Sequence, residues 1–381
     1  MKFFHLSDLH IGKQLHHYNL KEDQEHILNE VITYAKEICP DAIVIAGDVY
    51  DKSVPSAEAV TIFDEFLTQI ANLSIPVLMI AGNHDSAERL DYASRILGLQ
   101  NIYIAGRPPE SKDEFIKKVT MEDEYGEIDF YLLPFLKPGY VKNIFGAMPT
   151  SYSDAVDQLI EREQIDWNRR NVLISHQFYI GNGEVPDTCD SENISVGGID
   201  QVDIASVKQF DYVALGHLHG AQKVAMPHIR YSGTLLKYSV SEALQKKFLH
   251  VVTVKDKGQE VYVEQLPLHP IREVRKIRGN LADIIEDAQP ENKNDYVSIT
   301  LTDEINPYKP KEQLEKVYTH ILEIRIDNTR TRQKLTEFQE EISLSDPLDI
   351  FAEFYKEMQG KEMTDEEREI LTEIIDEGEE V

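Results

Sequence analysis

The sequence predicts a layered α/β fold, followed by a small α+β domain and a helical C-terminal tail. Two observations predict the layered domain: short runs of Val, Ile, Leu or aromatic residues have the pattern of buried strands, and stretches between them carry apolar residues at helical spacing. The expected helices are Glu22–Ile38 and Ser56–Asn72, with Ser56 as a candidate N-cap. The expected strands are Lys2–Leu6, Asp41–Ala46, Pro76–Ala81, Asn171–Ser175 and Asp211–Leu215.

The sequence changes character near Glu273. A strand candidate, Tyr296–Leu301, and a helix-then-strand pattern through Lys311–Ile326 predict a small α+β domain. The chain then becomes polar and helix-prone. We therefore expect three parts, at residues 1–265, 266–335 and 336–381. A basic patch opens the second part and consists of Arg272, Arg275, Lys276 and Arg278.

Composition excludes several classes of protein. The formal net charge of −29 argues against nucleic-acid binding by bulk attraction, so any such contact needs local basic groups, metals or a partner. No apolar run approaches the roughly 18 residues of a membrane helix. Because the first residues, Met1–His5, lack the apolar stretch of a signal peptide, the expected location is the cytoplasm, with no membrane association. Neither cysteine, Cys39 or Cys189, has a nearby partner, and both are expected to be reduced.

Metal-capable side chains follow directly after each of the five expected strands. Open α/β sheets place their ligand sites at this carboxyl edge, so we expect the groups to converge on one spot. Carboxylates, imidazoles and a carboxamide form a mixed oxygen and nitrogen set that suits Mn²⁺, Fe or Zn²⁺. The groups are Asp8-Leu9-His10, Gly47-Asp48-Val49-Tyr50-Asp51, Gly82-Asn83-His84-Asp85, His176, and Gly216-His217-Leu218-His219.

Each group alone also has a simpler interpretation. Asp48 and Asn83, each beside a glycine, are typical of tight turns. Two histidines separated by one residue, as in His217 and His219, can lie on one solvent-facing side of a strand. The conjunction decides between the two interpretations, because five such groups in order, each behind a buried strand, favour a metal centre.

The ordered motifs resemble those of the calcineurin-like metallophosphoesterase superfamily. Within it, several segments are similar to the SbcD family of bacterial nuclease subunits. The resemblance implies a domain of two sheets flanked by helices, a small α+β capping domain and a C-terminal helical segment. The segments that carry it are Ser7–Gly12, Gly82–Ser86, Tyr131–Phe135, Tyr231–Tyr238 and, more loosely, Asn306–Tyr308.

The resemblance also implies a ligand set for two divalent ions, with Mn²⁺ as the preferred metal and Mg²⁺, Fe or Zn²⁺ as alternatives. Asp48 would bridge them, and Asp51 would support the ligands from behind. His84 would act on the leaving group, and Asp85 either orients His84 or stabilises a turn as an Asx residue. One ion would be held by Asp8, His10, Asp48 and His219, and the other by Asp48, Asn83, His176 and His217.

By the same resemblance, the chain would be a two-metal DNA nuclease, with double-strand exonuclease and hairpin or single-strand endonuclease activity. It would be the nuclease subunit of an SbcCD-type complex that processes DNA ends in repair, replication and recombination. Residues 345–381 would bind a coiled-coil ATPase of the SbcC type, the chain would form a homodimer within a heterotetramer, and the complex would associate with the nucleoid. The basic patch is compatible with phosphate contacts or with a solvated strand.

Two rival functions share the metal ligands. A phosphomonoesterase or protein phosphatase would use the same centre, because this chemistry differs mainly in what surrounds the site. A non-catalytic scaffold would keep the metals for structure alone. The appended domain and amphipathic tail count against the first rival, and the presence of His84 counts against the second.

Overall fold

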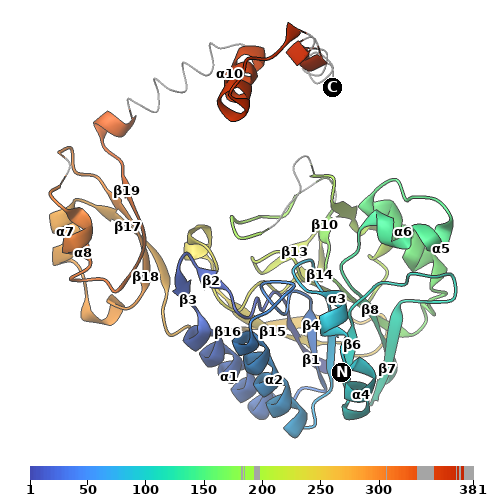
Figure 1. The fold of residues 1–381 in the computed structure, drawn as a ribbon. Helices are drawn as coiled ribbons and strands as arrows, with labels where there is room; N and C mark the ends of the chain where they lie inside the picture. Colours follow the sequence, from blue (N-terminus) through green and yellow to red (C-terminus); the bar gives the residue numbers. More distant parts are fainter. Residues whose placement is uncertain are drawn as a thin grey trace. The chain divides into compact units, whose positions relative to one another are not determined.

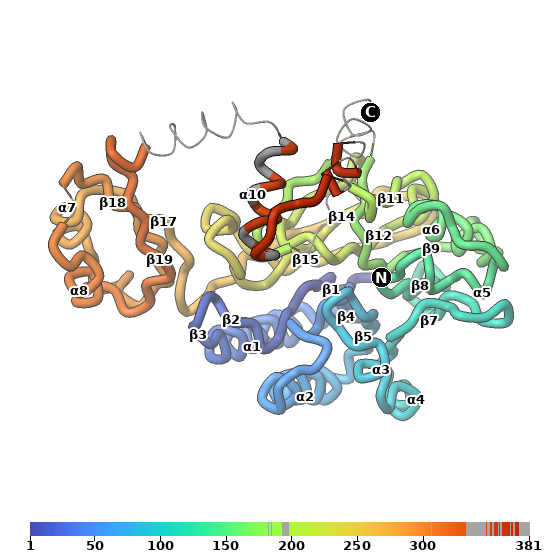
Figure 2. Tube along the Cα trace, turned by 45° about the horizontal axis from the view of Figure 1, so that its top comes forward, coloured from blue at the N-terminus to red at the C-terminus, as the bar shows by residue number. Residues whose placement is uncertain are grey.

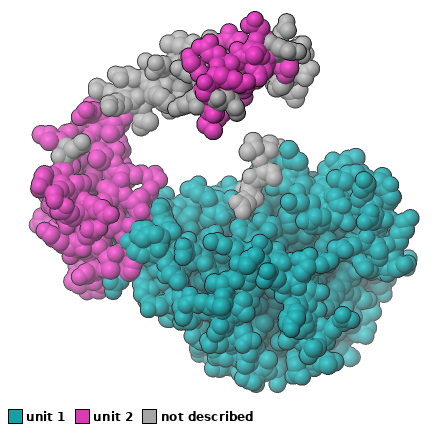
Figure 3. Space-filling view, in the orientation of Figure 1, with its two compact units in different colours: residues 1–276, 294–297 teal, residues 277–293, 298–381 magenta. Residues whose placement is uncertain are grey.

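The computed structural model describes residues 1–181, 183, 185–192, 198–305, 307–332, 347–365, 367–368 and 370–372. The chain divides into two compact units, coloured separately in Figure 3. The first comprises residues 1–276 and 294–297, and the second comprises residues 277–293 and 298–381. The first unit thus continues past residue 265, because Arg272 forms ion pairs with Glu22 and Asp23, and Tyr296 donates a hydrogen bond to Asp23.

Two six-stranded sheets form the framework of the first unit (Figure 1). In each sheet the central strands are parallel, which places their carboxyl ends at one edge. The first sheet has the order β16 (Tyr262–Pro267), β15 (Phe248–Thr253), β1 (Lys2–Leu6), β4 (Ala42–Ala46), β5 (Val77–Ile80) and β6 (Ile102–Ala105). The second has the order β13 (Gln222–Val224), β14 (Met226–Tyr231), β12 (Tyr212–Leu215), β9 (Arg170–Ser175), β8 (Gly126–Leu133) and β7 (Lys117–Asp123).

The two sheets pack face to face around a shared hydrophobic core. Phe3 of β1 meets Phe130 of β8 and Tyr212 of β12, with ring centroids 5.5 and 5.8 Å apart. Burial of such side chains on both faces explains why these strands appear in the sequence as continuous apolar runs. The core also includes Ala42, Val44, Leu78, Ile80, Leu132, Val172, Ile174 and Ala214.

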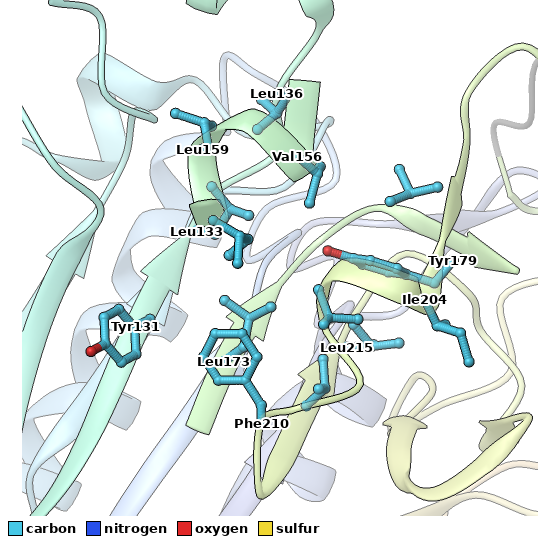
Figure 4. Close-up of a cluster of buried hydrophobic side chains, with 14 of the residues drawn as sticks. Tyr131, Leu133, Leu136, Val156, Leu159, Leu173, Tyr179, Ile204, Phe210 and Leu215 are labelled. Atoms are coloured by element: carbon cyan, nitrogen blue, oxygen red, sulfur yellow. The ribbon is translucent and has the colours of Figure 1, made fainter. Parts of the chain in front are cut away.

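Helices cover the outer faces of the sheets. The helices α1 (Lys21–Ile38) and α2 (Ala57–Asn72) lie side by side in Figures 1 and 2, and Ser56 caps α2 by accepting from the N–H of Ala59. On the other sheet, α6 (Tyr152–Arg162) contributes Val156 and Leu159 to a hydrophobic cluster that also contains Leu133 of β8 and Leu173 of β9 (Figure 4). The predicted α/β architecture of two sheets flanked by helices is confirmed.

Shorter elements complete the first unit. Short helices α3 (Ala87–Leu90), α4 (Ser94–Leu97) and α5 (Lys142–Phe145) lie in its loops. The two-stranded pairs are β2 (Gln14–Leu15) with β3 (Tyr18–Asn19), and β10 (Phe178–Ile180) with β11 (Gln201–Asp203).

A small α+β arrangement begins at Val274 and includes much of the second unit. Three strands form a sheet of order β17 (Val274–Gly279), β18 (Tyr296–Leu301) and β19 (His320–Ile326), accompanied by α7 (Leu281–Glu286) and α8 (Pro310–Leu314). Its buried residues include Ile284, Ile299, Leu301 and Leu314. A further helix, α10 (Pro347–Gln359), follows. Among the described residues, none of the helices has the length and apolar character needed to cross a membrane.

Candidate metal centre

Five parallel strands from both sheets end around one buried cluster. β1, β4 and β5 of the first sheet and β9 and β12 of the second each stop just before a polar group. Most of these side chains are almost inaccessible to solvent, and Asn83 and His84 are half-buried. The structure therefore brings together every residue that the sequence motifs nominated as a ligand, namely Asp8, His10, Asp48, Asn83, His176, His217 and His219, with His84 beside them.

The backbone at the strand ends is in an unusual conformation. Asp8, His10 and Asp48 have φ angles of 53°, 44° and 49°, and His217 has a φ of 106°. Residues with a side chain rarely adopt a positive φ, and holding one there costs on the order of 1–3 kcal/mol. The fold stabilises these four turns, which project carboxylate and imidazole groups into the same space.

Two glycines of the motifs, Gly47 and Gly82, are required because side chains of the cluster pack closely against them. A Cβ atom on Gly82 would lie 2.2 Å from Oδ1 of Asp48, and one on Gly47 would lie 2.4 Å from Nδ1 of His176. Gly47 also has a φ of 90°, which strains any residue with a side chain. These glycines therefore allow Asp48 and His176 to approach the neighbouring loops.

One half of the cluster is built from Asp8, His10 and His219. Nε2 of His10 lies 3.2 Å from Nε2 of His219, and ligand atoms of all three residues lie within 4.8 Å of one another. The N–H of His217 donates to both oxygens of Asp8, at 3.0 and 3.1 Å, which fixes the carboxylate. Two imidazole nitrogens that face each other beside a carboxylate form a set of donors for a cation.

The other half is built from Asn83, His176 and His217. Oδ1 of Asn83 lies 3.1 Å from Nε2 of His176 and 3.0 Å from Nδ1 of His217. Nδ1 of His176 donates to the carbonyl of Ala46 at 2.7 Å, so its Nε2 points into the cluster. Metal-binding histidines commonly use their second nitrogen in this way.

Asp48 lies between the two halves. Its Oδ2 is 3.8 Å from Nε2 of His10 on one side and 3.3 Å from Nε2 of His176 on the other. Its Oδ1 accepts a hydrogen bond from the backbone N–H of His84 at 2.8 Å. Among the described residues, this carboxylate is therefore placed to be shared by two cations.

The electrostatics of the cluster favour bound cations. Burial alone would raise the pKa of Asp48, but the charge and hydrogen bond of His176, with His10 and His84, lower it. Burial alone would lower the pKa of His176, but the charge and hydrogen bond of Asp48 raise it to about 9, so the two groups form an ion pair. Burial lowers the pKa of His10, and burial with His176 lowers that of His217 to about 3. The last two are therefore neutral imidazoles, the form that binds metals.

The donor set therefore fits divalent ions. Carboxylate, amide and imidazole donors without sulfur suit Mn²⁺, Fe or Zn²⁺. Burial raises the pKa of Asp8 to about 6, and a buried carboxylate of this kind needs positive charge beside it. Bound metal ions would supply that positive charge.

His84 is oriented by a backbone group. Its Nδ1 lies 2.9 Å from the carbonyl oxygen of Asp51, which can only accept, so Nδ1 carries a proton. Its ring packs edge-on against His10, with centroids 4.9 Å apart. Nε2 is consequently the nitrogen of His84 that can exchange a proton with a substrate.

Asp85 has a different position from the one expected of a residue that orients His84. Its carboxylate accepts hydrogen bonds from the backbone N–H groups of Gly82, Val49 and Tyr50, at 3.0, 3.1 and 2.9 Å. These bonds join the loop after β5 to the loop after β4. The structure thus favours the alternative interpretation, in which Asp85 stabilises a turn, and it assigns the orienting contact to Asp51.

A buried polar network behind His219 was not predicted. Ser191 Oγ lies 2.8 Å from Nδ1 of His219 and donates to Oε1 of Glu242 at 2.6 Å. Lys247 Nζ donates to Oε2 of Glu242 at 2.6 Å and to the carbonyl of His219 at 3.0 Å. The N–H of His219 donates to Glu192 at 2.6 Å. No local pattern marks these residues, although Glu242 follows the family-like segment Tyr231–Tyr238 closely.

The basic patch near residue 275 is largely neutralised. Arg272 pairs with Glu22 and Asp23, Arg275 with Asp295, and Arg278 with Asp327. An arginine side chain that already has a carboxylate partner gains less binding energy from a phosphate. The structure therefore favours the interpretation of this patch as a solvated strand over its interpretation as a phosphate-binding site.

Two family models match the chain, over most of its length. The model of the calcineurin-like phosphoesterase family matches residues 1–221, and that of the type 5 capsule protein repressor C-terminal domain matches residues 268–359. The crystal structure of a dimetal phosphatase from Danio rerio is similar with a TM-score of 0.41 and 11% identity, over 70% of this chain and 96% of that one.

The fold and the site define a calcineurin-like metallophosphoesterase, a metal-dependent hydrolase that acts on phosphate ester bonds. Full-length relatives narrow the class. The SbcD component of the SbcCD nuclease from Staphylococcus epidermidis is 34% identical over 99% of each chain, and that from Staphylococcus saprophyticus is 32% identical over 99% of this chain and 100% of its own. The chain belongs to the SbcD family of SbcCD nuclease components, as its motifs predicted.

Proposed function

We propose that the chain is a two-metal DNA nuclease and the nuclease subunit of an SbcCD-type complex. Its activities would be double-strand exonuclease and hairpin or single-strand endonuclease cleavage, on DNA ends that arise in repair, replication and recombination. The observation that carries the proposal is the position of Asp48 between two clusters of metal donors, with His84 beside Asp48 and His10.

Seven residues would hold the ions. Asp8, His10, Asp48 and His219 would hold one, and Asp48, Asn83, His176 and His217 the other. Two such ions, when bound, would activate a water molecule and neutralise charge on the phosphoryl oxygens. Mn²⁺ is our preferred metal, as the family resemblance implies, and Mg²⁺, Fe and Zn²⁺ are alternatives, because mixed oxygen and nitrogen donors suit several divalent ions.

His84 would protonate the departing 3′ oxygen of the phosphodiester. Asp51 would act as its positioning residue through the carbonyl oxygen. The same loop ties His84 to the metal centre, since its N–H donates to Asp48. An acid held this close to the shared carboxylate is well placed to protonate a leaving group on a bound phosphate.

The two full-length relatives are named as parts of a nuclease, which supports a nucleic acid as the substrate. The net charge of −29 is the main obstacle, because an acidic chain repels duplex DNA. We therefore assign part of the DNA-binding surface to a partner. A cytoplasmic, nucleoid-associated location would follow from this role.

A substrate screen tests the proposal. The protein with Mn²⁺ should cut labelled linear duplexes and hairpins, and should hydrolyse a chromogenic phosphomonoester far more slowly. Gel analysis of defined DNA ends and the absorbance of the released chromophore give the two rates. Turnover of the monoester alone would assign the chain to the phosphomonoesterases instead.

The C-terminal helix offers a surface for the partner. Phe351, Phe354 and Met358 of α10 follow helical spacing and are 44%, 55% and 67% exposed. An exposed apolar stripe of this kind is typical of a helix that docks on another helix. We propose that it binds a coiled-coil ATPase of the SbcC type. The sequence predicts another apolar stripe at helical spacing after this helix. It consists of Ile370, Leu371, Ile374 and Ile375, of which the last two lie outside the described residues.

Replacing both Phe351 and Phe354 with Glu should abolish co-purification of the chain with the ATPase and leave the isolated nuclease rate unchanged. Lys361→Glu, just beyond the same helix, is the matched control for added negative charge. Pull-down of the tagged ATPase measures the effect. Undiminished complex formation by the double variant would refute the docking site. A deletion after Ser345 addresses the same question but begins outside the described residues.

A second copy of the chain is also part of the proposed assembly. Tyr92, Ile96 and Leu99 are 81%, 68% and 80% exposed and lie close together in the sequence of the first unit, in a turn, in α4 and in the 3-10 turn that follows it. Large apolar residues exposed together mark interaction sites more often than free surface. We propose that they contribute to a homodimer within a heterotetramer, which the mass of the chain in solution would test.

A further inference from the structure

A cavity of about 460 Å³ adjoins the metal centre within the first unit. Three loops form its walls: the loop after β5 from Gly82 to Glu88, the loop after β6 from Gly106 to Glu110, and residues Phe135 to Tyr140 after β8. A cavity of this size lies within the range of sites that hold small organic groups. It lies beside the cluster of metal donors, and one donor, Asn83, also lines the cavity.

Two residues connect the cavity to the metal centre. Asn83 lines the cavity, and its Oδ1 contacts both His176 and His217 at 3.1 and 3.0 Å. Phe135 also lines the cavity, and its ring packs edge-on against that of His176, with centroids 6.4 Å apart. A group attached to a phosphate at the metal centre could therefore extend directly into the cavity.

The charges of the lining favour a neutral group over a second phosphate. Arg107 already pairs with Glu88 at 2.9 Å and with Glu110 at 3.6 Å. Asp85 also lines the cavity and accepts its three backbone hydrogen bonds. With Lys137, the lining holds two cations against three carboxylates, so it does not attract an anion. A neutral ligand with polar edges suits it better.

The aromatic residues indicate that this ligand is planar. Phe135 is half-buried and Tyr140 is 49% exposed, and both line the cavity. Aromatic side chains beside a nucleic-acid path stack on bases, and each stacked base contributes about 1–3 kcal/mol. The carboxylates of Glu88 and Glu110 can accept hydrogen bonds from the amino groups at a base edge.

We propose that this cavity receives one unstacked nucleobase of the strand that is being cut, next to the scissile phosphate. The inference rests on the proposed function and deepens it, because it assigns part of substrate recognition to the base. Unstacking a base costs a few kcal/mol, and less at a strand end or in a hairpin loop. The cavity would thus favour ends and loops over the interior of a duplex.

The test uses the full chain with Mn²⁺ and single-stranded oligonucleotides that either are intact or carry one abasic residue on either side of the cut bond. Tyr140→Ala removes a stacking surface, and Ser53→Trp fills the cavity from an exposed position on its rim. Tyr262→Ala, 64% exposed on β16, is the matched control. Hydrolysis of methyl p-nitrophenyl phosphate reports on the metal centre without any base.

We expect the unmodified protein to cut the intact strand about tenfold faster in kcat/KM than one of the abasic strands, as a stacking contribution of this size implies. Tyr140→Ala and Ser53→Trp should lower the intact rate to the abasic rate, and should leave the abasic strand and the small diester unaffected. Tyr262→Ala should change neither rate.

Equal cleavage of intact and abasic strands by the unmodified protein would overturn the base site while leaving the nuclease function in place. Variants that slow both strands equally would do the same. If the chain hydrolyses methyl p-nitrophenyl phosphate but no DNA, the proposed function fails and the base site fails with it.

Discussion

His84→Ala should lower DNA cleavage by about 10²–10⁴-fold, the range that a general acid contributes, and should leave metal content nearly intact. The hydrogen bond from His84 to Asp48 comes from the backbone N–H, which an alanine retains. The contact to Asp51 comes from the ring, so it is lost with the ring. Elemental analysis of the metal, beside the rate on a labelled duplex, separates the two effects.

The leaving group sharpens this prediction. A phosphodiester that releases p-nitrophenolate needs no proton at its leaving oxygen, so His84→Ala should hydrolyse it at close to the unmodified rate. Asp48→Ala is the contrasting variant, because it removes the carboxylate that faces both halves of the centre and should lose metal. Full nuclease activity in His84→Ala would show that His84 is not the general acid.

The strands and the polar motifs at their ends could be predicted from the sequence, because each is marked by a pattern within a short segment. Each motif residue directly follows a buried strand, and parallel strands bring their carboxyl ends to one edge. The helices were predictable from their apolar spacing, and the boundaries differ by only a residue or so, as where α1 begins at Lys21. Residues such as Asp8 and His217 could thus be nominated without knowledge of their contacts.

The support for the site could not be predicted, because it depends on contacts between distant segments. Ser191 lies 28 residues before His219 and 51 before Glu242, and the three meet only in the folded chain. The group that orients His84 is a backbone carbonyl. Every residue has such a group, so the residue type at this position could not reveal it. Asp85 shows the opposite case. Its position next to His84 in the sequence favoured a contact between the two side chains, but in the structure its carboxylate accepts hydrogen bonds from backbone N–H groups instead.

Glu242→Gln should weaken Mn²⁺ binding by roughly 10–100-fold, the usual effect of removing a group that supports a metal ligand. Glu242 is completely buried and reaches His219 through the hydroxyl of Ser191. Burial alone would raise the pKa of Glu242, but His219 and Lys247 lower it, so the group is a carboxylate. Its charge strengthens the orientation of His219, and a neutral amide of the same shape would hold the ring less firmly.

The same substitution should destabilise the fold, because it leaves Lys247 charged and buried. Breaking one side of a buried ion pair costs about 3–5 kcal/mol, whereas replacing both partners costs much less. Lys247→Met alone should therefore be unstable, and the double variant with Glu242→Gln should recover part of the loss. Chemical denaturation of the metal-free protein measures this contribution separately from metal binding.

Ser191→Ala distinguishes the metal effect from the stability effect. It removes the hydroxyl between Glu242 and His219 and leaves the ion pair with Lys247 in place. Calorimetric titration with Mn²⁺ should show weakened binding, while the free energy of unfolding without metal should change by less than in Glu242→Gln. If Ser191→Ala and the double variant both bind Mn²⁺ as tightly as the unmodified protein, the network stabilises the loop alone and His219 is oriented without it.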